Sequence, residues 1–408
     1  MLTVPASENM LCPGTGREVS VTMYGIPVIY SHVLIAVSGK EMEKRYNIPL
    51  GRPWIDEDEI AAVTEVLLSG WLTKGDRVGK FEDMIKDFQR CDYAVAVNSA
   101  TSALHLAAVI LGIGRGDEVI VPAFTYPATA NAMVHAGAKP VFVDITLRDF
   151  NINVSRIEEK ITENTKAIVP VHLFGYPADM YPILELAKQH NLKVIEDAAC
   201  SLGTTYKGRK VGTLGDCGAF SLHPRKCITT GEGGMLTTNN KDISNTAILL
   251  RSHGEKGKGR FVFAGYNYRM TEIQAAVGIE QMKKVFRILD QKRLVAKKYT
   301  DFLSDLNHDY ILLPLMEEGH TYQSYVIVIE DRVKRTRGEI ISKLAEKGVF
   351  THQGTYHVPG TEYYACDNGD FPNSRKAGDR TLVLPLYIGI TDDEIEHVSR
   401  SLRLLLCS

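Results

Sequence analysis

A lysine beside a dense run of glycines and hydroxyl side chains is the feature of this sequence best suited to chemistry. Lys226 follows an apolar run at 218–222 and precedes T-T-G-E-G-G at 229–234. Glycines at that density let the backbone approach a ligand closely or adopt positive φ. A lysine whose amine is neutral can form a Schiff base with a carbonyl compound. The usual place of a lysine is the solvated surface, so Lys226 alone does not decide the chemistry.

A carboxylate at the end of a second apolar run is the next candidate. Asp197 closes V-I-E-D at 194–197, and functional groups of an α/β sheet lie at the carboxyl ends of its strands. A carboxylate there could hold a proton on a heteroaromatic nitrogen. An aspartate in a strand-to-helix turn is also an ordinary helix cap, and Asp197 by itself favours that reading.

A phosphate could bind where small and hydroxylated residues join a buried strand to a helix. The segment N-S-A-T-S-A-L at 98–104 follows Y-A-V-A-V and precedes an apolar helical run. Free N–H groups, the helix dipole and the hydroxyls of Thr101 and Ser102 would together hold a phosphate. Serine and threonine also cap helices without a ligand. Tyr126, in F-T-Y-P, offers a face for stacking, although most tyrosines are simply packed.

Together these four features have one economical explanation, which is pyridoxal phosphate. That cofactor supplies the electron sink, while the protein must anchor its phosphate, protonate its ring and bind its aldehyde. A phosphate cradle, an aromatic face, a strand-end carboxylate and a Schiff-base lysine meet these needs in chain order.

Strands and helices alternate over most of the chain, which predicts an α/β fold with a mostly parallel sheet covered by helices on both faces. The expected strands of this part are 93–97, 118–121, 140–143, 167–171, 193–195 and 218–222. The expected helices are 59–68, 102–111, 181–189 and 272–289. Beyond about residue 297 a strand at 325–330 and helices at 338–347 and 392–405 predict a smaller α+β domain. We therefore expect a large domain at 46–296 and a small one at 297–408.

Composition excludes several classes of function. The 408 residues carry a formal net charge of -2 and no basic run interleaved with aromatics, so nucleic acid and anionic membranes are not expected partners. The seven cysteines are odd in number and form no C-x-x-C pair, so neither a disulfide framework nor a metal site is predicted. A reducing cytoplasm suits them best.

The first 45 residues differ from the rest. The apolar stretch 23–39 is interrupted by Pro27 and His32, is short for a membrane span and lacks the basic flank of a secretory leader. We expect a poorly ordered extension, or a sequence upstream of the domain, in preference to an anchor.

The stretch S-x-H-P-x-K-x-I-T-T-G-E-G-G at 221–234 resembles the DegT/DnrJ/EryC1/StrS family of sugar aminotransferases, within the aspartate-aminotransferase superfamily (fold type I). The resemblance runs from about residue 48 to the C-terminus. It implies that Lys226 binds the aldehyde of pyridoxal phosphate, that Asp197 pairs with the ring nitrogen and that Tyr126 stacks on the ring. The residues that it assigns to the phosphate are Ala100, Thr101, Ser102 and Ser221.

Two further stretches resemble the same family. G-Y-N-Y-R-M at 265–270 matches a segment whose asparagine, here Asn267, reaches the phosphate in the neighbouring subunit, which implies a homodimer with shared sites. S-G-W-L-T-K-G at 69–75 resembles a loop that helps to hold a nucleotide-sugar, with Thr73 and Gly75 matching. Two positions depart from the pattern. Cys200 stands where glutamine or histidine usually lies near the cofactor's phenolic oxygen, and residues 351–365 differ from the commoner form.

The resemblance implies transamination, with glutamate as amino donor and a nucleotide-linked keto-deoxysugar as acceptor, at C4 more readily than at C3. Related dehydratases carry histidine at the lysine position, so Lys226 argues against that reaction. A keto-cyclitol or another ketone without a nucleotide stays open as acceptor. A regulatory homologue without catalysis is the alternative from another class, although the intact lysine, aspartate and cradle argue against it.

Overall fold

The computed structural model describes residues 46–73, 75–365 and 369–407. The predicted extension 1–45, with its apolar stretch 23–39, lies outside the described residues. Within the described ranges, no helix combines the length and the apolar character that crossing a membrane requires.

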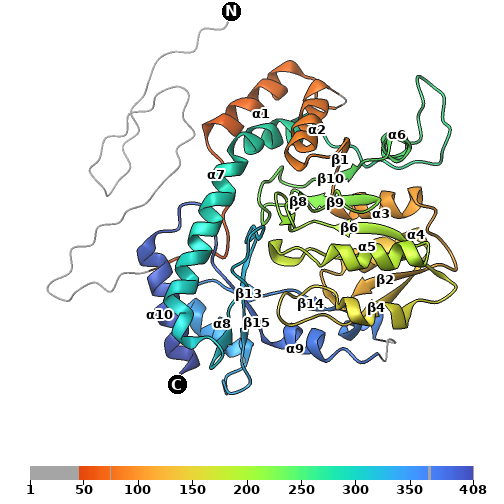
Figure 1. Cartoon of the computed structure of the whole chain (residues 1–408). Helices are drawn as coiled ribbons and strands as arrows, with labels where there is room; N and C mark the ends of the chain where they lie inside the picture. Colours follow the sequence, from red (N-terminus) through yellow and green to blue (C-terminus); the bar gives the residue numbers. More distant parts are fainter. Residues whose placement is uncertain (1–45, 74, 366–368, 408) are drawn as a thin grey trace, which may run out of the picture. The chain divides into compact units, whose positions relative to one another are not determined.

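A seven-stranded sheet forms the centre of the part that carries the predicted site (Figure 1). In spatial order its strands are β1 (Tyr93–Val97), β10 (Gly234–Thr238), β9 (Cys217–Ser221), β6 (Lys193–Asp197), β5 (Thr165–Ile168), β2 (Glu118–Pro122) and β4 (Lys139–Val143). Strand β10 pairs antiparallel with both neighbours, and the other pairings are parallel. The predicted α/β class with a mostly parallel sheet is confirmed.

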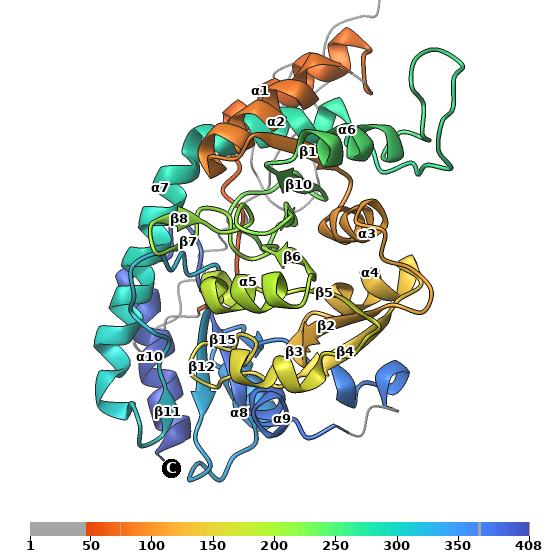
Figure 2. The ribbon, with the colours of Figure 1, turned by 45° about the vertical axis from the view of Figure 1, so that its right-hand side comes forward.

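Two layers of helices cover this sheet (Figure 1, Figure 2). On one face pack α2 (Asp76–Gln89), α5 (Met180–Gln189) and α7 (Glu272–Leu303). On the other face pack α3 (Ala100–Ile110), α4 (Ala128–Ala136) and α6 (Lys241–Leu250). Because both faces are covered, most of the strands read as continuous apolar runs, and six of the seven were predicted from the sequence. Strand β10, which has the sequence G-M-L-T-T, was missed.

A second, four-stranded antiparallel sheet lies in the C-terminal part of the chain. Its strands in spatial order are β11 (Ile311–Leu312), β12 (Tyr325–Ile329), β15 (Thr381–Leu384) and β13 (His352–Gln353). Helices α8 (Arg337–Glu346) and α10 (Asp392–Leu406) share an apolar core with this sheet, and α9 (Pro372–Arg380) packs beside it.

Helix α7 belongs to both cores. Ile279 and Leu289 pack under the seven-stranded sheet, whereas Tyr299 and Leu303 pack with the four-stranded sheet. Thr271 caps the helix in a capping box with Gln274, which explains its start, and the helix runs well beyond the predicted end at 289. The predicted boundary between 296 and 297 falls inside this helix and stays a prediction.

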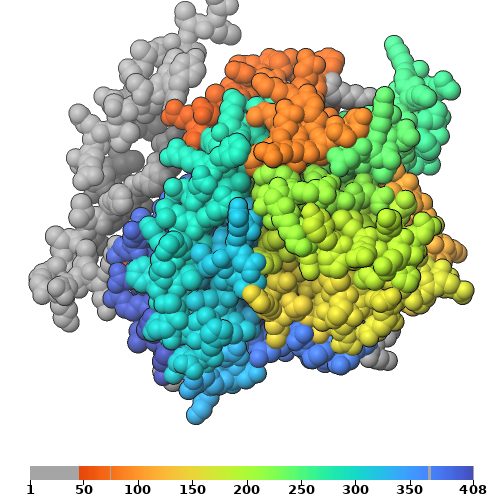
Figure 3. Space-filling model, in the orientation of Figure 1, coloured from red at the N-terminus to blue at the C-terminus, as the bar shows by residue number. Residues whose placement is uncertain are grey.

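Helix α1 (Glu57–Ser69) and α2 pack on α7, as Figure 3 shows for one face of the molecule. A capping box of Asp56 and Glu59 starts α1. The buried Glu272, at the start of α7, accepts the N–H groups of Arg77 and Val78 at 3.1 Å each and so caps α2. Helix α2 was missed from the sequence because its cap lies on a distant segment.

A separate two-stranded sheet links a segment that follows β2 to a segment that follows β13. Strand β3 (Phe124–Thr125) pairs antiparallel with β14 (Tyr356–His357). The segment 351–365, which differs from the commoner family pattern, therefore lies directly beside Tyr126. A separate hairpin joins β7 (Thr205–Tyr206) to β8 (Arg209–Lys210).

Candidate active site

Asp197 ends β6 with its carboxylate almost completely buried. Its side chain is 5% exposed. Oδ2 accepts the hydroxyl of Thr129 at 2.7 Å, and Oδ1 accepts the N–H of Ala199 at 3.1 Å. Burial raises the pKa of Asp197, and these two hydrogen bonds, followed by the positive charge of Lys226, oppose that shift. A carboxylate held this way can face a cationic group without water between them.

Lys226 lies on the loop that follows β9, beside the loop that follows β6. Its Nζ donates to the Sγ of Cys200 at 3.1 Å. Strands β9 and β6 are adjacent and parallel, with Asp197 opposite Ala219. The carboxyl ends of these two strands therefore bring the lysine, the aspartate and the cysteine to one edge of the sheet.

The N-terminus of α3 has the properties of an anion cradle. Ser99 caps the helix by accepting the N–H of Ser102 at 3.1 Å, whose hydroxyl donates to Asn98 at 2.7 Å. In the described part of the chain no acceptor is found for the N–H groups of Ala100 and Thr101. These donors and the helix dipole point to a negatively charged ligand.

Gly234 lets this helix end reach the sheet edge. A Cβ at Gly234 would lie 2.3 Å from the carbonyl carbon of Ser99 and 2.5 Å from the nitrogen of Ala100. Gly234 of β10 also pairs with Ser221 of β9, so the predicted phosphate ligand Ser221 lies next to the residue that approaches the cradle. The glycine run that marked Lys226 in the sequence thus serves the phosphate side as well.

Tyr126 precedes α4 and is 64% exposed, so its ring is free for stacking. The ring of Tyr356 meets it edge to face, with centroids 6.0 Å apart. The backbone oxygen of Tyr126 lies 3.1 Å from the Thr129 hydroxyl, which itself contacts Asp197.

Thr73, Gly75 and Asn267 make no hydrogen bond to Lys226 among the described residues. Thr73 pairs with Thr271 in an isolated bridge, Gly75 precedes α2, and the exposed Asn267 offers its backbone oxygen to the Nδ2 of Asn98 at 3.4 Å. The contacts within this one chain do not bring their side chains to Lys226. Their predicted roles stay predictions.

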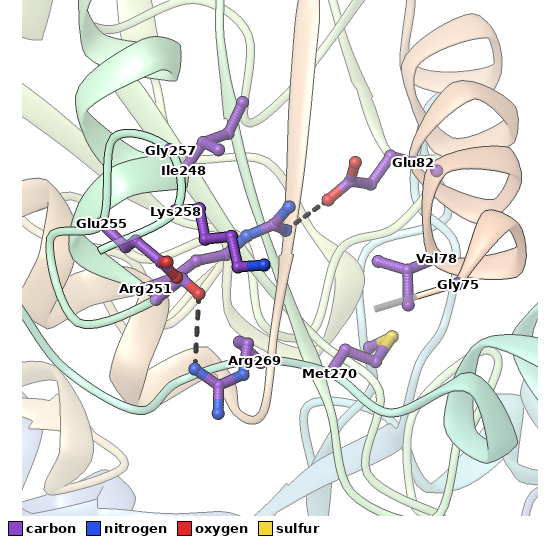
Figure 4. Close-up of a pocket in the computed structure, with 12 residues that line it drawn as sticks. Gly75, Val78, Glu82, Ile248, Arg251, Glu255, Gly257, Lys258, Arg269 and Met270 are labelled. Carbon is purple, nitrogen blue, oxygen red and sulfur yellow. Dashed lines mark hydrogen bonds and ion pairs between the residues drawn. The ribbon is translucent and has the colours of Figure 1, made fainter. Parts of the chain in front are cut away.

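A cavity of about 580 Å³ opens beside Gly75. It lies between the start of α2 and the segment 248–270, and Lys226 and Asp197 do not line it. Figure 4 shows Arg251 directed at Glu82 of α2. Its charged lining residues are Glu82, Arg251, Glu255, Lys258 and Arg269.

Two buried groups at the site escaped the sequence-based prediction. Thr129 lies in A-T-A-N-A, which has no distinguishing pattern, and only the fold brings it to Asp197. Glu196 has no exposed surface and accepts four hydrogen bonds, from His172 Nε2 at 2.9 Å and from the N–H groups of residues 212, 214 and 215. It anchors the end of β6 on the side opposite Asp197. In the sequence, the position of Glu196 directly before Asp197 at the end of an apolar run was the signal that could have identified it.

Comparisons with known proteins identify the family of this chain. Residues 53–403 match the DegT/DnrJ/EryC1/StrS aminotransferase family. A GDP-perosamine synthase of Caulobacter vibrioides is 40% identical over 363 residues, which cover 87% of this chain and 97% of that protein.

Solved structures are similar over the same range. PseC of Helicobacter pylori, described as an aminotransferase involved in the biosynthesis of pseudoaminic acid, has a TM-score of 0.83 and 27% identity, covering 88% of this chain and 99% of PseC. The PLP-form of Spr1654 of Streptococcus pneumoniae, described as a putative sugar aminotransferase, has a TM-score of 0.82 and 29% identity, covering 88% and 98%. The chain belongs to the DegT/DnrJ/EryC1/StrS family and is an aminotransferase.

Proposed function

We propose that this aminotransferase uses pyridoxal phosphate to transfer an amino group from glutamate to the keto group of a nucleotide-linked keto-deoxysugar. The observation that carries the proposal is the meeting of Lys226, the buried Asp197 and the open N-terminus of α3 at one sheet edge. The relatives support the acceptor class, because a GDP-perosamine synthase and a pseudoaminic acid enzyme are both named for sugar products.

The residues present fit this cofactor. The unpaired N–H groups of Ala100 and Thr101, with the hydroxyl of Ser221, would hold the phosphate. Tyr126 would cover the ring and Asp197 would face its nitrogen. Lys226 would bind the aldehyde carbon, and Cys200, already in contact with Lys226, would lie near the phenolic oxygen. Cysteine is a weaker hydrogen-bonding group than the usual glutamine or histidine.

When bound, the cofactor supplies an electron sink for the carbanion that forms on the donor carbon. The protein supplies two further contributions. Asp197, when ionised, stabilises positive charge at the ring nitrogen. The Nζ of Lys226, which would hold the aldehyde, would also take a proton from the donor's α-carbon and return it as general base and acid.

The cavity at the start of α2 supports a nucleotide-linked acceptor. Three basic residues and two acidic residues supply its charge. Figure 4 shows Arg251 directed at Glu82 and Arg269 directed at Glu255, which leaves Lys258 as the lining residue that can attract a diphosphate. Gly75, in the segment that resembles a nucleotide-sugar loop, lines it too. We assign amination to C4 in preference to C3, because the H-P-R-K form of the lysine motif resembles members that act there.

We further propose a cytoplasmic homodimer in which Asn267 of each chain serves the other chain's site. The exposed position of Asn267 is compatible with this arrangement.

A direct assay tests the proposed function. Purified protein is incubated with glutamate and a panel of nucleotide-linked 3-keto and 4-keto sugars, together with a keto-cyclitol. The products are identified by mass spectrometry. We expect an aminated 4-keto sugar. Exclusive turnover of the cyclitol would replace the acceptor class. Failure of the protein to bind pyridoxal phosphate, judged by absorbance and by borohydride labelling of Lys226, would favour a non-catalytic homologue.

A further inference from the structure

The hydroxyl of Thr129 lies against the carboxylate of Asp197 at the buried end of β6. Thr129 is in the first turn of α4 and is 1% exposed, and its Oγ1 is 2.7 Å from Asp197 Oδ2. Asp197 has one other protein donor, the N–H of Ala199 on Oδ1 at 3.1 Å. Thr129 is therefore the single side chain that donates a hydrogen bond to this carboxylate among the described residues.

The direction of this hydrogen bond follows from the number of available hydrogens. The Thr129 hydroxyl has three oxygens within reach: Asp197 Oδ2 at 2.7 Å, Thr125 Oγ1 at 2.9 Å and the Tyr126 carbonyl at 3.1 Å. It has one hydrogen to donate. An ionised carboxylate accepts only, and hydrogen bonds to it are the shortest and strongest. When Asp197 is ionised, the hydrogen therefore goes to its Oδ2, and the buried Thr125 donates its own hydrogen to Thr129.

This short chain of hydroxyls opposes the effect of burial on Asp197. Burial raises the pKa of Asp197, and the hydrogen bond from Thr129 is the largest contribution that lowers it. The N–H of Ala199 and the charge of Lys226 follow. The imidazole of His172 is engaged elsewhere, because Nε2 contacts Glu196 and Nδ1 accepts the N–H of Ala178.

We propose that Thr129 is a positioning residue that keeps Asp197 ionised and fixes the direction of its free lone pairs, with Thr125 as its support. The proposal rests on the proposed function, in which Asp197 faces the ring nitrogen of pyridoxal phosphate. A proton shared between that nitrogen and the carboxylate stays on the group with the higher proton affinity. Loss of the Thr129 hydrogen bond raises the proton affinity of Asp197 and moves the proton away from the ring.

The test uses pyridoxal phosphate labelled with ¹⁵N in the ring, bound to the full-length protein. The ¹⁵N chemical shift distinguishes a protonated from an unprotonated ring nitrogen and does not require turnover. Thr129→Val removes the hydroxyl and keeps the shape, whereas Thr129→Ser keeps the hydroxyl. We expect the Thr129→Val resonance to move towards the unprotonated position, Thr129→Ser to match wild type, and Thr125→Val to fall between them.

Kinetics provide a second measurement. Loss of one hydrogen bond to a charged group lowers turnover by about tenfold or more in Thr129→Val, with KM for the donor little changed. Thr129→Ala serves as a second hydroxyl-free variant if Thr129→Val does not fold, as judged by circular dichroism. A wild-type ¹⁵N shift in a folded hydroxyl-free variant would overturn the proposal. Wild-type protein that fails to bind the cofactor would instead overturn the proposed function.

Discussion

At the scale of single residues, the site combines a buried acid with a partly accessible amine. Asp197 is 5% exposed and has no basic side chain bonded to it among the described residues, so its charge depends on the Thr129 hydroxyl, the Ala199 N–H and the field of Lys226. Such a carboxylate is costly to bury unless a cationic partner arrives. The ring nitrogen of the proposed cofactor would be that partner, and its arrival would lower the pKa of Asp197.

Asp197→Asn tests this dependence. The amide has a similar shape and no charge, so we expect the cofactor to remain bound while turnover falls by about a hundredfold or more, at ~1.4 kcal/mol of barrier per tenfold. Cofactor absorbance and single-turnover rates with glutamate measure the two effects separately. Near-normal turnover would mean that Asp197 only caps the turn after β6.

At the scale of elements, the proposed phosphate cradle depends on how closely β10 approaches the start of α3. The approach requires glycine, because a side chain on Gly234 would meet the backbone of Ser99 and Ala100, which cannot move independently of the helix. The predicted phosphate donors therefore depend on a strand that is far from α3 in sequence.

Gly234→Ala tests this contact. We expect the free energy of unfolding to fall by about 1–3 kcal/mol, which is typical of overpacking. We also expect weaker cofactor binding, because the N–H groups of Ala100 and Thr101 shift. Thermal unfolding and fluorescence titration with pyridoxal phosphate measure these effects. The control is Gly338→Ala in α8, where the nearest atom to the new Cβ is 4.0 Å away. Equal behaviour of the two variants would contradict the close approach.

At the scale of the whole molecule, α7 connects the cores of the two sheets, and β3–β14 pairing sets residues 351–365 beside the site. Lys292 lies in α7 between the two groups of core residues. Its side chain is 6% exposed and its Nζ donates to the Gln323 carbonyl at 3.3 Å. Burial lowers the pKa of Lys292.

Lys292→Met should therefore stabilise the fold at neutral pH. Removing a poorly compensated buried amine is expected to raise the free energy of unfolding by about 1 kcal/mol or more. In wild type, Lys292 has a lowered pKa in the folded state and a pKa of about 10.4 in the unfolded state. At pH values between these two pKa values, the unfolded state binds more protons than the folded state. The stability of wild type rises with pH across that window.

Denaturant unfolding at several pH values checks both statements. The difference in free energy of unfolding between Lys292→Met and wild type should shrink as the pH rises towards the pKa of an unperturbed lysine. Lys297→Met, an exposed lysine in the same helix, is the control and should change stability by no more than about 0.5 kcal/mol. If Lys292→Met is less stable than wild type, the interactions of the Lys292 amine offset the cost of burying it, and the prediction is wrong.

The proposed dimer is tested by mixing subunits. Lys226→Ala and Asn267→Ala chains are combined and allowed to exchange. If sites are shared, each heterodimer has one site with both lesions and one with neither, so activity rises above that of either parent. If Asn267 serves its own chain, every mixed site keeps one lesion and activity does not recover. The measurement requires proven exchange and a clear defect in the Asn267→Ala parent; without recovery, the shared site is wrong and the aminotransferase assignment stands.

The sequence by itself determined the parts of this protein that depend on local pattern. Covered strands read as apolar runs, so the parallel sheet, Asp197 at a strand end and Lys226 before its glycines were all predictable. The tertiary structure decided which distant residues meet. Thr129 reaches Asp197, Gly234 meets Ser99, and Tyr356 meets Tyr126 only because strand order and helix packing bring their segments together. Hydrophobic periodicity specifies which face of an element is buried, but it carries no information about which side chain from another segment will lie opposite a given polar group.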